Sequence, residues 1–127
     1  MQKKPYRPFQ ISCGLMEGYD AETATSHTIE EASVIIQNWI RDRVVSNKKV
    51  VAGTLIEGQF IYPINKNQNL SAQIEPSFHY KGIVREDTSD EEALELLEDL
   101  VKNLSQKLNQ KRIHIQFCSD YFLFEKE

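Results

Sequence analysis

The pattern of apolar and polar positions predicts two amphipathic helices, each opened by a capping sequence. Residues 28–31 (TIEE) and 89–92 (SDEE) each place a glutamate three positions after a hydroxyl residue, which is the capping-box pattern. Apolar residues then recur every three or four positions, from Ile29 to Val44 and from Ala93 to Leu108. Acids gather at the start of the second helix and basic residues near its end, which favours a solvated helix face over an acidic binding patch.

Apolar residues at every second position predict the strands. Phe9 to Leu15 and Ile74 to Arg85 alternate in this way, so each is expected to have one buried face. Two further segments are predicted to be hairpins: Val51 to Tyr62, with its turn at Glu57-Gly58, and Ile113 to Phe124, with its turn at Ser119-Asp120.

The helix and hairpin patterns repeat along the chain. The two capping sequences are 61 positions apart and the two hairpins 62, which divides the chain into β-α-β-β halves at residues 9–64 and 74–126. A polar link, Asn65 to Ser71, joins the halves, and residues 1–8 form a basic arm with two prolines. We therefore predict one α+β domain over residues 9–127 with the ferredoxin-like plan. Both helices should lie on one face of an antiparallel or mixed sheet.

The alternation also assigns side chains to the two faces of this sheet. The helix-covered face is expected to hold Phe9, Ile11, Cys13, Val51, Leu55, Ile113, Ile115 and Phe117. The open face is expected to hold Gln10, Ser12, Thr54, Ile56, His79, Lys81, His114, Gln116 and Cys118. A face that no helix covers either contacts water or binds a partner.

Composition narrows the class of protein. The 127 residues include 19 acidic and 15 basic ones, a balance opposite to that of nucleic-acid-binding domains, so nucleic acid is an unlikely partner. We find no apolar run long enough for a signal sequence or a membrane span, and a cytoplasmic protein without membrane contact is the expectation. Cys13 and Cys118 lack metal-site spacing and are expected to be reduced, and no cofactor or metal is expected.

The predicted order of elements resembles that of known trimeric families. Two β-α-β units, each with a short extra hairpin strand, look like the tautomerase superfamily, whose short strands extend neighbouring sheets in a trimer. Tautomerases catalyse from a proline exposed at the amino terminus, whereas this chain begins Met1-Gln2 with Pro5 further in, so that residue does not carry over. The CutA copper-tolerance proteins and the nitrogen-regulatory PII proteins share the order and also trimerise. These resemblances imply a homo-oligomer.

Few residues suggest chemistry. On the predicted open face, His79 and His114 are weak catalytic candidates, because imidazoles near a hydroxyl suit proton transfer or metal ligation. The alternative is that they are ordinary polar residues of a solvated sheet face. The possible open-face site consists of Ser12, His79, Lys81, His114 and Gln116.

Aromatic pairs end both predicted hairpins. Phe60 with Tyr62, and Phe122 with Phe124, either cover the ends of the helices or form an edge that pairs with a second chain. The sequence thus favours a non-catalytic, homo-oligomeric interaction or regulatory module, a dimer or trimer that could also bind a protein partner. The alternative is a tautomerase-like enzyme or ligand-binding protein with a pocket on the open sheet face or between subunits.

Overall fold

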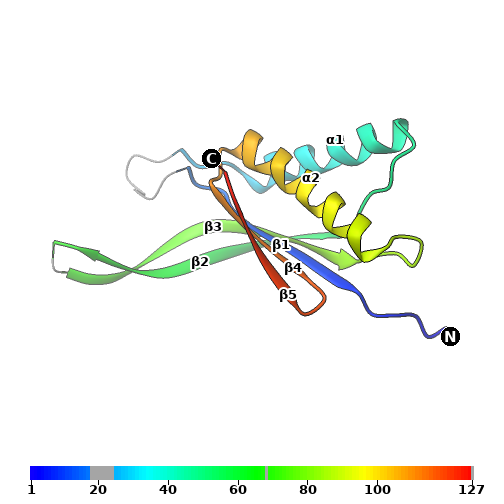
Figure 1. The fold of residues 1–127 in the computed structure, drawn as a ribbon. Helices are drawn as coiled ribbons and strands as arrows, with labels where there is room; N and C mark the ends of the chain where they lie inside the picture. Colours follow the sequence, from blue (N-terminus) through cyan, green and yellow to red (C-terminus); the bar gives the residue numbers. More distant parts are fainter. Residues whose placement is uncertain (18–24, 68, 127) are drawn as a thin grey trace.

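The computed structural model describes residues 1–17, 25–67 and 69–126 and shows a two-layer α+β fold (Figure 1). Its elements are β1 (Pro8–Gly14), α1 (Ile29–Val45), β2 (Thr54–Lys66), β3 (Asn69–Ile83), α2 (Asp90–Leu108), β4 (Arg112–Phe117) and β5 (Asp120–Glu125). The strands form one antiparallel sheet in the order β2-β3-β1-β4-β5, and both helices lie on one face of it. The predicted ferredoxin-like arrangement is confirmed, with β1 and β3 adjacent in the middle.

The core lies between the helices and the sheet. Phe9, Ile11 and Cys13 of β1 are buried, while Gln10 and Ser12 between them are partly exposed, as the alternation predicts. Helix α2 buries a continuous stripe of leucines, and burying each such side chain stabilises the fold by roughly 1.5–3 kcal/mol. Of the residues predicted for the covered face, Leu55 is only partly buried, and it still packs against the core.

Both helices begin where their capping sequences predict. Thr28 Oγ1 accepts a hydrogen bond from the backbone N–H of Glu31 (3.2 Å), and Ser89 Oγ accepts one from Glu92 (3.1 Å). Only the second helix completes the capping box, because the Glu92 carboxylate accepts a hydrogen bond from the Ser89 backbone N–H. The Glu31 carboxylate instead binds the imidazole of His27, so the two caps differ in chemistry despite their matching sequences.

The first predicted hairpin is wrong. Strand β2 continues through Glu57-Gly58 as far as Lys66, and Gly58 pairs with Ser77 of β3. A Cβ atom at Gly58 would lie 2.9 Å from His79 Nε2, so this glycine permits close packing within the sheet. The chain reverses instead between Lys66 and Asn69, within the segment predicted to be a polar link, where Asn67 has a φ of 54°, a left-handed conformation that asparagine tolerates.

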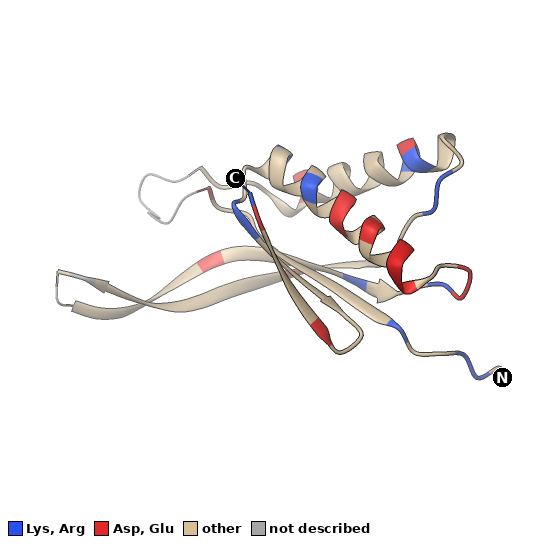
Figure 2. Cartoon of the chain, in the orientation of Figure 1, with Lys and Arg blue, Asp and Glu red and all other residues tan. Residues whose placement is uncertain are grey.

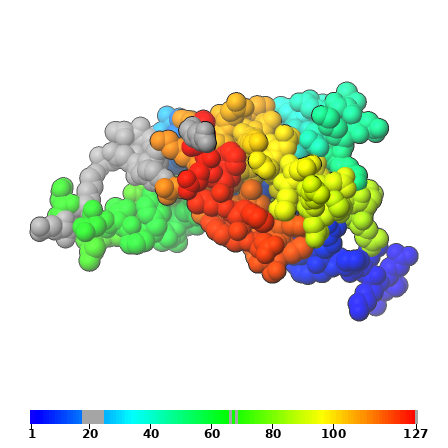
Figure 3. Space-filling model, viewed as in Figure 1, coloured from blue at the N-terminus to red at the C-terminus, as the bar shows by residue number. Residues whose placement is uncertain are grey.

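The long β2–β3 pair projects beyond the helices as an arm (Figures 1 and 3). By contrast, the second predicted hairpin is present, and its turn lies at Cys118 and Ser119, one residue before the predicted Ser119-Asp120, because Asp120 already pairs with Phe117. Only the second half therefore has an additional short strand, and the predicted β-α-β-β repeat is partial.

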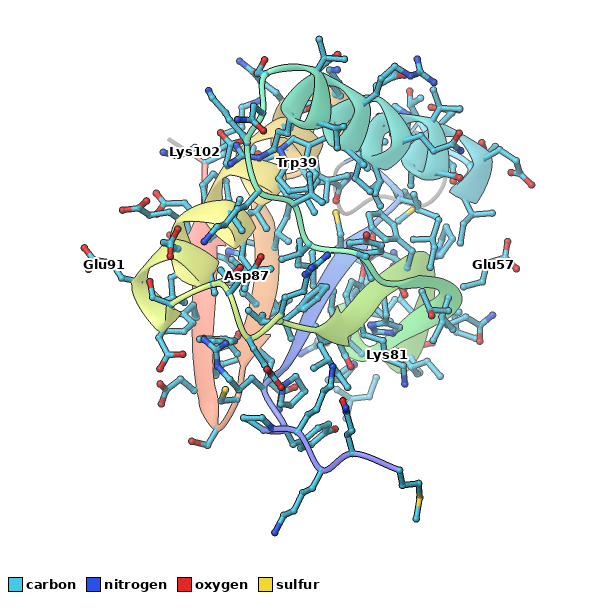
Figure 4. All side chains as sticks on the ribbon, turned by 90° about the vertical axis from the view of Figure 1, so that its right-hand side faces the viewer. Trp39, Glu57, Lys81, Asp87, Glu91 and Lys102 are labelled. Carbon is cyan, nitrogen blue, oxygen red and sulfur yellow. The ribbon has the colours of Figure 1, made fainter. Side chains whose placement is uncertain are left out.

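A polar cluster joins the two helices at the surface of the core. Trp39 of α1 is buried, and its Nε1 donates to Asp99 of α2 (2.9 Å). Arg43 donates to the same carboxylate (3.1 Å), and its guanidinium lies 5.2 Å from the centre of the Trp39 ring. Trp39 lies between the helices in Figure 4. The cluster thus fixes the helix pair above the sheet.

The charged residues are distributed as the sequence predicts around α2. Acids line its first turns, and basic residues follow the end of α1 in the connection toward β2 (Figure 2). Within the described part of the chain, neither helix combines the length and apolar character of a membrane span.

Candidate functional site

The sheet register aligns three of the predicted open-face residues in one row. Ser12 of β1 lies opposite His79 of β3 on one side and His114 of β4 on the other. Ser12 Oγ is 2.8 Å from His79 Nδ1 and accepts a hydrogen bond from Gln10 Nε2 (3.2 Å). The prediction that these residues share a face is therefore correct at the level of the backbone.

The side chain of His114 nevertheless does not join those of Ser12 and His79. His114 Nδ1 makes a hydrogen bond with the hydroxyl of Tyr121, which turns this imidazole away from Ser12 and toward β5. Lys81 and Gln116 are exposed and lie in the next row, opposite Gln10. No group of three or more metal-ligating side chains is found among the described residues.

Neither cysteine belongs to this row, since Cys13 lies on the buried face of β1 and Cys118 follows β4. Both are free thiols, and burial raises the pKa of the Cys13 thiol to about 12, which leaves it uncharged and unreactive near neutral pH. Cys118 is partly exposed in the β4–β5 turn at φ 54°.

A cavity of about 760 Å³ lies at one end of the open face. It is bounded by the residues that follow β1, by the β2–β3 arm, by the α2–β4 turn and by β5. A cavity of this volume suits a small organic molecule. Among the sequence candidates, His114, Phe60 and Tyr62 line it, whereas Ser12, His79, Lys81 and Gln116 do not.

The four aromatic residues predicted as an oligomer edge lie on different faces. Phe60 and Tyr62 belong to the same side of β2 and reach the cavity. Phe122 and Phe124 pair with Ile115 and Ile113 on the helix-covered side of β5; Phe124 packs against the core, and Phe122 is exposed. Their matching positions in the sequence therefore do not create one continuous edge.

Glu75 places a carboxylate in the wall of the cavity. It lies directly opposite Phe60 in the β2–β3 register and is only 9% exposed. Burial raises the pKa of Glu75, and a hydrogen bond with Tyr62 partly offsets this rise. A carboxylate held out of water in this way interacts strongly with a cation that enters the cavity.

Gln110 forms part of the opposite wall, in the turn between α2 and β4. Its side chain is buried, and Nε2 donates to the carbonyl oxygens of Met16 (3.0 Å) and Leu108 (3.2 Å). Ser105 Oγ donates to the Gln110 carbonyl oxygen (2.6 Å). Because Met16 follows β1, this glutamine joins two elements that bound the cavity.

His27 lies between two carboxylates near the same wall. Its Nε2 is 2.7 Å from Glu17, which lines the cavity, and its Nδ1 is 2.7 Å from Glu31 in the first turn of α1. Burial by itself disfavours the charged imidazole, but the hydrogen bonds to Glu31 and Glu17 outweigh it and raise the pKa of His27. The hydrogen bond with His27 also lowers the pKa of Glu31.

This arrangement predicts a pH-dependent stability. A histidine whose pKa is raised by folding stabilises the native state below its unfolded pKa of about 6.5, and this contribution is lost as pH rises through the folded pKa. We expect the free energy of unfolding, measured in urea between pH 6 and pH 9, to decrease more for the wild type than for His27→Gln. If the free energy of unfolding depended equally on pH in the two proteins, the ion pairs of His27 with Glu17 and Glu31 would be contradicted.

Glu75, Gln110 and His27 were not among the residues that the sequence predicted for this region. A signal for Glu75 was present, because residues 75, 77, 79 and 81 alternate on one side of the third long strand. Gln110 and His27 carry no such periodic signal, since both lie outside the strands and helices. Their contacts span up to 94 positions along the chain.

The fold and the cavity together define a small ferredoxin-like protein with a ligand-sized site at the end of its open sheet face. No protein-family model matches the chain, and no curated protein matches it. Two solved structures of a phage SAM lyase share the fold over 100% of this chain and 96% of theirs, at 17% identity. The complex with S-methyl-5′-thioadenosine has a TM-score of 0.70, and the apo form has 0.71.

This likeness corrects the main functional prediction from the sequence. The expectation of a non-catalytic interaction or regulatory module is wrong, because two solved structures that share the fold are those of an enzyme, one of them with a bound small molecule. The alternative, a small-molecule enzyme or ligand-binding protein, is the better supported one. The sequence motifs predict secondary structure only. The cavity could not be predicted from them, because it is lined by segments that are far apart in the sequence.

Proposed function

We propose that this chain is an enzyme that cleaves S-adenosylmethionine (SAM) to S-methyl-5′-thioadenosine in the cavity beside Glu75. The observation that carries the proposal is the likeness to the phage SAM lyase along the whole chain. The cavity supports it independently, since its volume of about 760 Å³ accommodates a nucleoside with an amino-acid side arm.

The chemistry requires one carbon–sulfur bond to break. SAM carries a positively charged sulfur, and S-methyl-5′-thioadenosine is the neutral thioether that remains when the bond from sulfur to the amino-acid side arm breaks. The sulfur keeps the electron pair of that bond and loses its charge. In a lyase no water is added, so the four-carbon fragment must supply the compensating electrons, either by loss of a proton or by attack of its own carboxylate on the carbon.

Glu75 is positioned to hold the cationic half of such a substrate. The α-ammonium group of the side arm stays charged throughout the reaction, so a partly desolvated carboxylate can orient it in both the bound state and the transition state. Tyr62, which interacts with Glu75, would keep the carboxylate in place. The walls formed by Phe60 and the α2–β4 turn are then available to the nucleoside half.

The test is direct. Purified protein is incubated with SAM, and S-methyl-5′-thioadenosine is quantified by liquid chromatography and mass spectrometry. We expect its accumulation with time and with enzyme concentration, together with an equal amount of the four-carbon fragment. Unchanged SAM would overturn the proposal.

The raised pKa of Glu75 gives the reaction an expected pH dependence. The carboxylate must be ionised to bind the ammonium group, so kcat/KM should fall as pH decreases through a pKa above the ordinary glutamate value of about 4.3. In Glu75→Gln this acidic decrease should be absent. A wild-type profile without an acidic limb would contradict the assigned role of Glu75.

Self-association is a second part of the proposal. Edge strand β5 exposes Tyr121 (62%) and Leu123 (42%), and Leu123 also borders the cavity. An edge strand with exposed apolar side chains is suited to pairing with another chain. We expect light scattering to report a mass above one chain for the wild type.

A lysine on this edge tests the pairing. Phe122→Lys should reduce the mass, because charged residues on an edge strand oppose pairing. Val45→Lys, on the exposed end of α1, serves as the control and should leave the mass unchanged. A wild-type monomer at high concentration would rule out self-association.

A further inference from the structure

The side-chain amide of Gln110 has a fixed orientation at the cavity wall. Its Nε2 donates to the backbone carbonyl oxygens of Met16 (3.0 Å) and Leu108 (3.2 Å). If the amide were flipped, Oε1 would face these two carbonyl oxygens, and none of the three atoms could donate a hydrogen bond. The side chain is only 8% exposed, which prevents it from rotating into solvent. Both N–H groups of the amide are thus used by the protein.

The amide oxygen of Gln110 is left as an acceptor beside Gly14. A Cβ atom at Gly14, directed to the open face, would lie 3.0 Å from this Oε1. No hydrogen bond to Oε1 is formed by the described residues, although the side chain is more than nine-tenths buried. An acceptor held in this way favours a ligand that brings an N–H donor.

An aromatic surface borders the same space. The position that a Cβ atom of residue 14 would occupy, 3.0 Å from Gln110 Oε1, is also 3.8 Å from Cε2 of Phe60. Because residue 14 is glycine, no side chain fills this space. The Phe60 ring meets His114 edge to face, with 6.2 Å between centroids. A flat heterocycle that contacts Phe60 can therefore direct an amino group at Gln110 Oε1.

We propose that Gln110 is a specificity-determining residue whose Oε1 accepts a hydrogen bond from the 6-amino group of the ligand's adenine. This inference rests on the proposed function and assigns the two ends of the ligand. Adenine lies between Phe60 and Gln110, and the cationic side arm extends toward Glu75, which faces Phe60 across the β2–β3 register. A 6-oxo purine would place an acceptor against an acceptor, so the site selects adenosyl over inosyl ligands.

The decisive measurement compares two ligands that differ only at this group. S-methyl-5′-thioadenosine and its deaminated form, S-methyl-5′-thioinosine, are titrated into the wild-type protein by calorimetry. We expect the adenosine compound to bind about 10- to 100-fold more tightly, as for a lost hydrogen bond that leaves a buried acceptor unpaired. Equal affinities would overturn the role of Gln110 while leaving the proposed function intact, and binding of neither compound would overturn both.

Two variants separate recognition from a structural role. In Gln110→Met the ratio of the two affinities, adenosine compound over inosine compound, should fall to about one. If Gln110 only supported the fold, its replacement would weaken the binding of both compounds equally and leave this ratio unchanged. Gly14→Ala retains Gln110 and its two donors but places a methyl group beside Oε1, and it should also reduce the preference. Gln106→Met, at an exposed position of α2, is the control and should keep the wild-type preference. A preference that persists in both test variants would contradict the proposal.

Discussion

Glu75→Gln is expected to lower kcat/KM for cleavage of SAM by about 100-fold, the cost of a reacting group that is no longer held in place. Glutamine keeps the volume of the side chain but removes the negative charge that binds the ammonium group. Because burial already raises the pKa of Glu75, the neutral amide should not destabilise the fold. The measurements are initial rates of S-methyl-5′-thioadenosine formation and a thermal melt of each protein.

The matched control is Glu57→Gln. Glu57 belongs to the same strand pair, but its side chain is exposed and points away from the rest of the molecule in Figure 4. We expect it to retain wild-type activity. Should the two variants lose activity equally, the effect would reflect the charge of the β2–β3 arm, and the specific role of Glu75 would be excluded.

Gly82→Ala is expected to lower the free energy of unfolding by about 3 kcal/mol, near the upper end for overpacked sites. The segment before β2 crosses β3 at this glycine, and a Cβ atom there would lie 2.3 Å from the Ala52 carbonyl oxygen. That segment is fixed, since the Tyr80 hydroxyl donates to the carbonyl oxygen of Val51 (2.8 Å). The backbone must therefore move to admit a methyl group, which urea denaturation would report.

Gly58→Ala provides the comparison, because it adds the same methyl group to the neighbouring strand. Its Cβ would approach the tip of the His79 side chain (2.9 Å from Nε2), and that imidazole can rotate away. We expect a change within about 1 kcal/mol in either direction. If the two variants lost comparable amounts of unfolding free energy, the mobility of the contacted atom would not determine how strongly the added methyl group destabilises the fold.

The sequence predicted the elements whose signals are local. Both helices begin at the predicted caps, since Thr28 and Ser89 bind backbone N–H groups only three residues away. The alternation from Phe9 to Cys13 correctly separated the buried face from the open one. The second hairpin was correct for the same reason, because its turn and both strands lie within about a dozen residues.

The prediction of the first hairpin was wrong because glycine occurs both in turns and at positions where another side chain packs closely against the backbone. At Gly58 it admits the imidazole of the neighbouring strand, and at Gly14 it leaves space beside Gln110. Neither use can be distinguished from a turn without the partner strand. Alternation likewise places Ser12, His79 and His114 on one face without fixing their contacts: Ser12 and His79 share a hydrogen bond, whereas His114 binds Tyr121 of β5.

The sequence by itself determined the helices, most of the strands, the face of the sheet that is buried and the ferredoxin-like plan, because each of these follows from capping or from periodicity over neighbouring residues. Only the tertiary structure decided the long β2–β3 arm and the cavity at the end of the sheet. Glu75 and Gln110 are 35 positions apart, and they border one cavity because the sheet register and the α2–β4 turn bring them there. That convergence depends on packing between distant segments, which no local pattern encodes.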